Sequence, residues 1–116
     1  MLVYKSLEEI EIIRQNNLLV SKTLAEVAKL IKPGVTTLKL DKRAEEYIRD
    51  NGAVPGFLGY GGFPNSLCTS VNDQVVHGIP SDYMLKDGDV VSIDCGTYMD
   101  GYYGDSAYTF PVGNVS

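Results

Sequence analysis

The sequence predicts an α+β fold in which two helices cover one face of a mostly antiparallel sheet. The first half of the chain has two stretches with apolar residues at helical spacing. The second half has about five short segments rich in β-branched and aromatic residues, and the two kinds of segment do not alternate. The chain has 116 residues. Residues 1–116 are therefore expected to form one small domain with a modest core.

The first helix is expected over residues 7–31. Ser6 and Glu9 have the spacing of a capping box, in which each side chain bonds the backbone of the other residue. Pro33 and Gly34 stop the helix. Its apolar stripe has a spacing of mostly three or four, with Asn17 as the interruption: Ile10, Ile13, Val20, Leu24, Val27 and Ile31.

A second helix is expected to begin at Thr36 or Thr37, since either hydroxyl can cap its first turn. Asp41 is assigned to that first turn, where the helix dipole favours an anion. Asn51 and Gly52 are typical of a helix end. The expected apolar face consists of Leu40, Ala44, Tyr47 and Ile48.

The strands follow a stretch crowded with glycines and aromatics. Residues 53–64 are expected to form an irregular loop, because this density of glycine disfavours a helix and Pro64 limits any strand to an edge. A short strand is expected over residues 66–71 and a second extended piece over residues 74–77.

The last two strands, over residues 90–98 and 102–110, are predicted to form a hairpin. Asp100 and Gly101 between them favour a type I′ turn, which needs positive φ at both central positions. Paired residue numbers then sum to 201, so Asp94 lies opposite Ala107 and Asp105 lies opposite Gly96.

Asp94 and Asp105 are candidate metal ligands. As diagonal neighbours on one face they lie about 7–8 Å apart at Cα, and Gly96 is expected to leave the space across from Asp105 empty. Asp94 is expected to be buried in an apolar strand, where a carboxylate needs a partner, and no Lys or Arg follows Lys86. A divalent cation is therefore favoured, although two ligands do not complete a site.

The single histidine, His77, lies at a predicted strand end beside a loop, where it could serve structure or donate to a developing oxyanion. It could also supply one more metal ligand. Phe57, Tyr60, Phe63 and Cys68 could wall a small apolar pocket or belong to the core, and the residues alone leave both interpretations open.

Composition excludes several classes of protein. The net charge of -5 argues against a nucleic acid or an anionic membrane as partner. No apolar run reaches the roughly 18 residues of a membrane span. Two cysteines without a Cys-x-x-Cys pattern exclude a zinc finger within the chain and fit a reducing, cytoplasmic location.

Five motifs in register resemble the type I methionine aminopeptidases of peptidase family M24. They are GYGGFP at residues 59–64, CTSVN at 68–72, VHGIP at 76–80, DGDVVSID at 87–94 and GD at 104–105. The resemblance implies the pita-bread fold, a pseudo-symmetric arrangement around an antiparallel sheet. It also implies metal-dependent removal of N-terminal methionine from nascent polypeptides.

The resemblance also implies roles for individual residues. Asp94 and Asp105 correspond to metal ligands, and His77 corresponds to a histidine near the scissile amide of the substrate. Tyr60, Phe63 and Cys68 correspond to walls of the methionine pocket, with Phe57 beside them, although the family often has tyrosine at position 63. The implied cofactors are two divalent ions of the Co, Mn, Fe, Zn or Ni class, and the implied partners are peptides with N-terminal methionine.

The sequence departs from the family in one large respect. The second half of the family's fold supplies another histidine and two glutamates as ligands, but this sequence has one histidine and no glutamate after Glu46. The chain is therefore expected to correspond to the N-terminal half only and to be inactive alone. The complementary half and a second copy of the chain are the candidate protein partners.

Two alternatives remain open at this point. The half-fold could be a non-catalytic module that binds a peptide or a partner subunit. A prolidase-like member of the same fold is less favoured, because the VHGIP motif and the short N-terminus look like the methionine enzymes.

Overall fold

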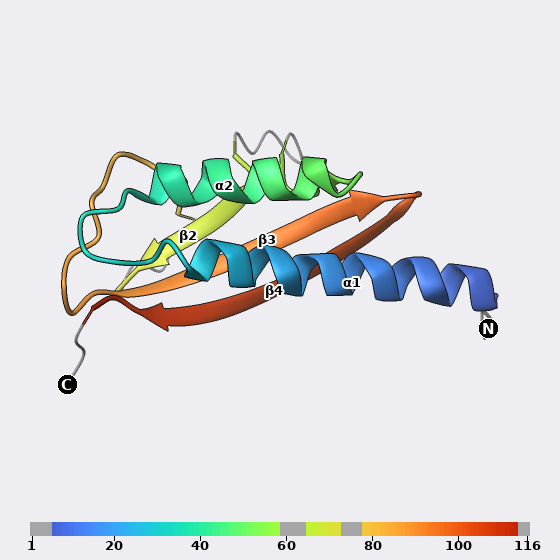
Figure 1. The fold of residues 1–116 in the computed structure, drawn as a ribbon, viewed down its shortest axis with the longest axis horizontal. Helices are drawn as coiled ribbons and strands as arrows, with labels where there is room; N and C mark the ends of the chain where they lie inside the picture. The colour runs from blue at the N-terminus through green and yellow to red at the C-terminus, as the bar shows by residue number, and fades with distance from the viewer. Residues whose placement is uncertain (1–5, 59–64, 73–77, 114–116) are drawn as a thin grey trace.

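The computed structural model describes residues 6–58, 65–72 and 78–113. The described residues form two helices and four strands in the expected order (Figure 1). The elements are α1 (Leu7–Ala28), α2 (Thr37–Asp50), β1 (Val54–Pro55), β2 (Leu67–Val71), β3 (Val90–Met99) and β4 (Tyr102–Pro111).

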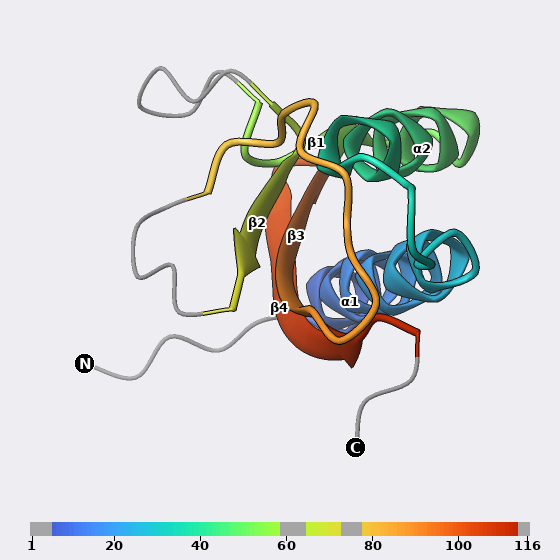
Figure 2. The same ribbon diagram turned by 90° about the vertical axis from the view of Figure 1, so that its left-hand side faces the viewer.

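The sheet is antiparallel and is built around β3. β4 pairs with β3 along its whole length on one edge, while β1 and β2 pair with different parts of the other edge. Both helices lie on one face of this sheet, and no described helix covers the other face (Figure 2). The predicted α+β arrangement is confirmed, and we call the uncovered side the open face.

The irregular loop predicted after α2 is partly wrong, because Val54 and Pro55 form β1. β1 pairs with Tyr98 and Thr97 near the far end of β3. A two-residue strand leaves no periodic pattern in a sequence, so tertiary pairing alone defines it. The extended piece predicted over residues 74–77 lies outside the described residues.

Helix α1 begins with the predicted capping box. The Ser6 hydroxyl accepts from the Glu9 backbone N–H at 3.1 Å, and the Glu9 carboxylate accepts from the Ser6 N–H at 3.1 Å. The helix ends at Ala28, three residues before the predicted end. Ile10 is 49% exposed, since the N-terminal turns of α1 extend past the sheet (Figure 1).

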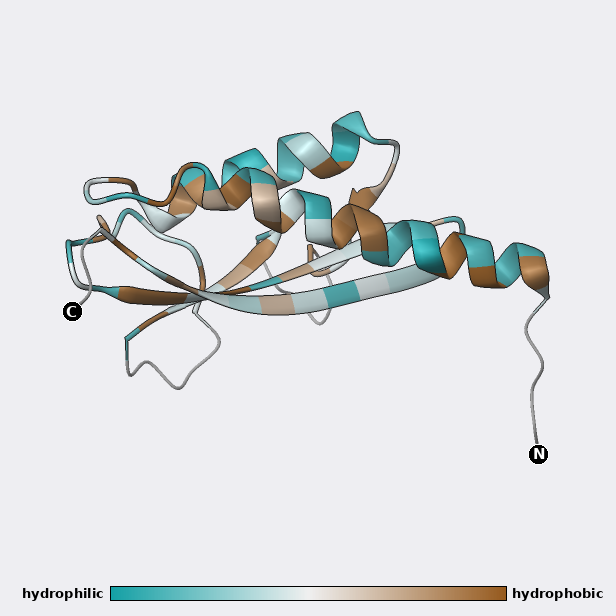
Figure 3. Cartoon of the chain, turned by 60° about the horizontal axis from the view of Figure 1, so that its bottom comes forward, coloured by the Kyte–Doolittle hydropathy of each residue, from teal (hydrophilic) through white to brown (hydrophobic). Residues whose placement is uncertain are grey.

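The buried stripe of α1 differs from the predicted one. Asn16 is fully buried, whereas Asn17 is exposed and does not interrupt the stripe. Polar and apolar residues alternate along both helices, as expected for helices with one face on a sheet (Figure 3). The buried residues of α1 are Asn16, Leu19, Val20, Thr23, Leu24 and Val27.

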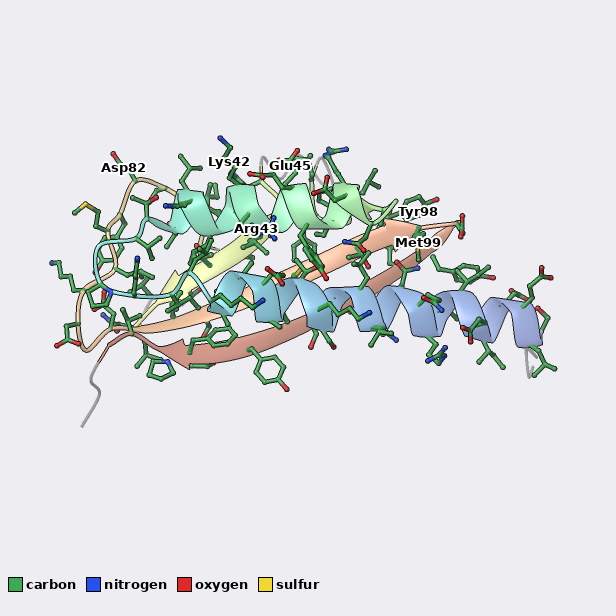
Figure 4. The ribbon with its side chains drawn as sticks, viewed as in Figure 1. Lys42, Arg43, Glu45, Asp82, Tyr98 and Met99 are labelled. Atoms are coloured by element: carbon green, nitrogen blue, oxygen red, sulfur yellow. The ribbon has the colours of Figure 1, made fainter. Side chains whose placement is uncertain are left out.

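Helix α2 begins as predicted, with the Thr36 hydroxyl accepting from the Lys39 backbone N–H at 3.1 Å. Leu40, Ala44 and Ile48 are fully buried against the sheet. Arg43 lies on the side of α2 that faces α1, whereas Lys42 lies on the outer side (Figure 4). Arg43 donates to Glu26 of α1 at 3.1 Å, which joins the two helices.

The hairpin has the predicted turn and register. Asp100 and Gly101 have φ values of 53° and 88°, as a type I′ turn requires. Met99 pairs with Tyr102 beside the turn, and the pairing continues without a bulge to Val90 and Pro111. This regular register decides which side chains share the open face.

Candidate active site

Asp94 and Asp105 lie on the open face of the sheet. The register pairs Asp94 with Ala107 and Asp105 with Gly96, as the sequence predicts. Because side chains alternate between the faces of a strand, the buried residues at positions 93 and 95 place Asp94 on the side away from the helices. The two carboxylates are therefore diagonal neighbours on one surface.

The expected burial of Asp94 is wrong. Asp94 and Asp105 are both exposed, because no described element covers the open face above them. Within the described residues, neither carboxylate makes a hydrogen bond or an ion pair. Asp94 therefore does not need a cation to offset the cost of burial. Both carboxylates remain available to a ligand.

The space above Gly96 is filled, contrary to expectation. A Cβ built on Gly96 would lie 3.0–3.3 Å from three ring carbons of Phe57. Gly96 faces Asp105 across the hairpin and lies two residues from Asp94. An aromatic ring therefore stands beside both carboxylates, and a side chain at position 96 would require the Phe57 ring to shift by a few tenths of an ångström.

Cys68 lies on β2 directly across from Asp94. Burial is the main cause that raises the pKa of the Cys68 thiol, and the charge of Asp94 raises it further, while a backbone hydrogen bond from Gly78 opposes both. Cys68 and Phe57 thus flank the two aspartates on the open face. Both positions are compatible with the walls of a pocket.

Gly78 continues the sheet edge beyond β2. Its carbonyl accepts from the Thr69 N–H at 2.8 Å. A Cβ on Gly78 would lie 1.4 Å from the Thr69 carbonyl oxygen, so only glycine fits here. His77, Tyr60 and Phe63 lie outside the described residues, and their predicted roles stay predictions.

Cross-strand pairs stand on either side of the aspartates. The rings of Tyr98 and Tyr103 lie 4.6 Å apart between centroids toward the turn. Ser92 and Thr109 share a hydrogen bond of 3.0 Å toward the other end. Such pairs stabilise a hairpin and hold its register, which keeps the diagonal relation of Asp94 and Asp105 fixed.

Asp41 is a buried residue whose role the sequence did not reveal. It is not in the first turn of α2, and its exposed fraction is 6%. One carboxylate oxygen accepts from the backbone N–H groups of Ser66 at 2.8 Å and Leu67 at 2.7 Å. The other oxygen accepts from Asn65 Nδ2 at 3.1 Å. Asp41 therefore fixes the start of β2, and no local pattern could have indicated these contacts.

Asp89 plays a similar part where β2 ends and β3 begins. Its carboxylate accepts from the Lys86 N–H at 2.9 Å, from Asn72 Nδ2 at 3.1 Å and from the Tyr83 hydroxyl at 2.8 Å. These donors, led by the Lys86 N–H, lower the pKa of Asp89. Asn72 in turn accepts from the Val90 N–H at 2.9 Å.

The donors on the open face fit part of a divalent metal site. Carboxylate oxygens are suitable ligands for such ions. Over residues 6–58, 65–72 and 78–113, however, no group of three or more His, Cys, Asp or Glu side chains is arranged to hold a metal ion. Asp94 and Asp105 could therefore contribute to a site that other residues complete.

In residues 6–58, 65–72 and 78–113, no helix has the length and apolar character to cross a membrane.

Residues 11–116 match the model of metallopeptidase family M24. The chain therefore belongs to this family, whose peptidases depend on metal ions. Methionine aminopeptidase 1 of Bacillus subtilis (strain 168) is 50% identical over 116 residues, which are 100% of this chain and 47% of that protein. The chain spans about half the length of the curated relatives it matches.

Solved structures agree with this assignment. The methionine aminopeptidase from Rickettsia prowazekii superimposes with a TM-score of 0.94 and 39% identity, over 100% of this chain and 47% of that one. The Xaa-Pro dipeptidase from Bacillus anthracis has a TM-score of 0.80 and 24% identity, over 97% and 30% respectively. The dipeptidase shares the fold, and the chain corresponds to half of the pita-bread arrangement.

Proposed function

We propose that this chain supplies part of the active site of a methionine aminopeptidase, which removes N-terminal methionine from new polypeptides. The observation that carries the proposal is the common open face of Asp94 and Asp105, flanked by Phe57 and Cys68. The 50% identity to a methionine aminopeptidase over the whole chain supports it. The substrate class is thus a peptide with a free N-terminal methionine.

Each residue has a proposed role. Asp94 and Asp105 would be ligands of two divalent ions, which when bound would activate water for attack on the first peptide carbonyl. Phe57 and Cys68, with Tyr60 and Phe63, would line the pocket for the methionine side chain and exclude water from it. His77 would donate a hydrogen bond that orients the scissile amide or stabilises the developing oxyanion.

The family resemblance implies a further histidine and two glutamates as ligands, but the sequence has one histidine and no glutamate after Glu46, so the chain alone is expected to have no activity. The test combines it with the C-terminal part of the B. subtilis relative, beyond the segment that this chain matches. The mixture, supplied with Co²⁺ or Mn²⁺, should release methionine from a Met-Ala-Ser peptide, whereas the chain alone should not. Absence of release in every metal would contradict the proposal.

Asparagine variants test the two aspartates. Asp94→Asn and Asp105→Asn should each lower methionine release in the mixture by at least about 100-fold, since a neutral amide is a poor ligand for a divalent ion. Asp100→Asn is the matched control, because Asp100 lies in the turn of the same hairpin and asparagine suits its positive φ. Full activity in both site variants would refute the assignment.

A binding module without catalysis is the second candidate. The absence of a complete ligand group among the described residues favours it for the isolated chain. Calorimetry separates the two candidates. Retained binding of Met-Ala-Ser, without metal binding or turnover in the mixture, would favour the module.

A further inference from the structure

Asp41 is connected to the open face through β2, although it belongs to a helix on the other side of the sheet. Its carboxylate holds the backbone N–H groups of Ser66 and Leu67 at 2.8 and 2.7 Å. Cys68 follows immediately and lies opposite Asp94. The position of Cys68 on the open face therefore depends on a strand start that Asp41 fixes.

We call the contacts of the Asp41 carboxylate with Asn65, Ser66 and Leu67 the anchor of β2. The burial of Asp41 makes these contacts necessary. The residue is 6% exposed, and no described Lys or Arg forms an ion pair with it. A buried carboxylate without a cation is retained at low cost only when several N–H groups bind it. The Ser66 and Leu67 N–H groups and the Asn65 amide serve this purpose, so the carboxylate and the strand start stabilise each other.

The two sides of the candidate pocket are attached by different means. On the Phe57 side, the Gly56 N–H donates to the Gly96 carbonyl at 2.9 Å, and the Phe57 ring rests on Gly96. That side is therefore attached to β3 directly. On the Cys68 side, β2 also pairs with β3, and the start of β2 has a further attachment to α2 through Asp41.

We propose that Asp41 is a positioning residue that sets the Cys68 wall of the methionine pocket. This inference rests on the proposed function, because it assigns Cys68 to that pocket. Loss of the anchor loosens the start of β2 and displaces Cys68, while Asp94 on the central strand stays in place. Substrate binding then weakens more than the chemical step.

Alkylation of the two cysteines tests the anchor without any need for activity. Asp41→Ala in the 116-residue chain should raise the rate of Cys68 alkylation by iodoacetamide about tenfold, through local opening of β2. Cys95 is fully buried, and burial followed by the charge of Asp41 raises its pKa to about 12, so it should stay unreactive. Unchanged Cys68 alkylation in Asp41→Ala would overturn the anchor.

If Asp41→Ala unfolds the whole chain, both cysteines will react. Asn65→Ala is the second variant, which tests the anchor in that case. It removes only the contact at 3.1 Å and leaves both backbone contacts intact. It should raise Cys68 alkylation about threefold without exposing Cys95. If Asp41→Ala unfolds the chain and Asn65→Ala leaves Cys68 unchanged, the anchor is overturned.

Kinetics of the two-part mixture test the effect on the pocket. Asp41→Ala should raise the KM for Met-Ala-Ser about tenfold and lower kcat less than about threefold, because misplacement of a binding wall weakens substrate positioning. Asp41→Asn should restore KM to within about threefold of the original, since an amide oxygen can still accept from Ser66 and Leu67. Asp50→Ala, on the exposed end of α2, is the control.

The outcomes separate the two proposals. Faster Cys68 alkylation with an unchanged KM would overturn the positioning role. An equal rise in KM for Asp41→Ala and Asp41→Asn would also overturn it, because rescue by the conservative variant would be absent. A mixture without methionine release, but with the expected alkylation pattern, would contradict the proposed function and leave the anchor supported.

Discussion

Four aspartates of this chain divide into a buried pair, Asp41 and Asp89, and an exposed pair, Asp94 and Asp105. Asp41 and Asp89 are 6% and 8% exposed, and each accepts three hydrogen bonds from nearby segments. Asp94 and Asp105 are exposed on the open face and accept none from the described residues. The comparison separates carboxylates that hold the fold together from carboxylates that remain available for a ligand.

Asp41→Ala should have the largest effect on stability. The free energy of unfolding should fall by about 3 kcal/mol, because two buried backbone N–H groups lose their acceptor and each loss costs about 1–3 kcal/mol. Urea denaturation of the 116-residue chain, followed by circular dichroism, measures this change. A loss below about 1 kcal/mol would mean that Asp41 does not belong with the fold-holding pair.

Asn16→Ala tests how much a second buried polar side chain on the helix-covered face contributes to stability. The Asn16 amide donates to the carbonyls of Met99 and Tyr102 at 3.2 Å each, and its oxygen accepts from the Thr97 hydroxyl at 2.9 Å. Its removal should cost about 2 kcal/mol of unfolding free energy. Asn17→Ala is the control on the exposed side, and an equal cost in both variants would contradict the assignment.

Alanine substitutions at Gly104, on the helix-covered face, and at Gly96, on the open face, compare how tightly the two faces are packed. A Cβ on Gly104 would lie 3.1 Å from the Asn16 backbone, so Gly104→Ala should push α1 from the sheet and cost about 1–3 kcal/mol. Gly96→Ala meets the half-buried Phe57 ring, which can move, and should cost less than about 1 kcal/mol. Thermal melting ranks the two variants, and the reverse order would contradict the comparison.

Acid should weaken the contribution of Asp89. Its folded-state pKa lies below the unfolded value of about 3.9, so its stabilising effect is present above that pH and fades as the pH falls toward the folded pKa. The stability difference between the original chain and Asp89→Asn should therefore shrink below about pH 4. Urea titrations between pH 3 and 7 test this, and a constant difference would count against it.

Asp94→Asn and Asp105→Asn should have the smallest effect on stability. Each should change the free energy of unfolding by less than about 0.5 kcal/mol, because no described contact depends on either carboxylate. Urea denaturation of both variants measures the change. A loss of about 2 kcal/mol or more would show that the residue stabilises the fold, as Asp41 and Asp89 do.

The sequence predicted those features that depend on local spacing. The capping box at Ser6, the turn at Asp100 and the register that pairs Gly96 with Asp105 were all confirmed, because each follows from residues close in the chain. The diagonal placement of Asp94 and Asp105 followed from that register.

The remaining features depend on contacts between segments far apart in the chain. Asp41 bonds residues 24 to 26 positions away, and Asn16 bonds residues more than 80 positions away. The covering of Gly96 by Phe57 likewise joins two distant segments. Periodicity cannot reveal such contacts, and it cannot tell whether a strand residue such as Asp94 faces solvent or protein.

The two-residue turn at Asp100 and Gly101 also has a consequence for the order of folding. All pairs between β3 and β4 lie within the 22 residues from Val90 to Pro111, so the loop that must close is short. Hairpins of this kind form in about 1–10 μs, whereas docking of α1 through Asn16 closes a loop of more than 80 residues. We therefore expect the surface that carries Asp94 and Asp105 to be ordered in register before the helices cover its other side.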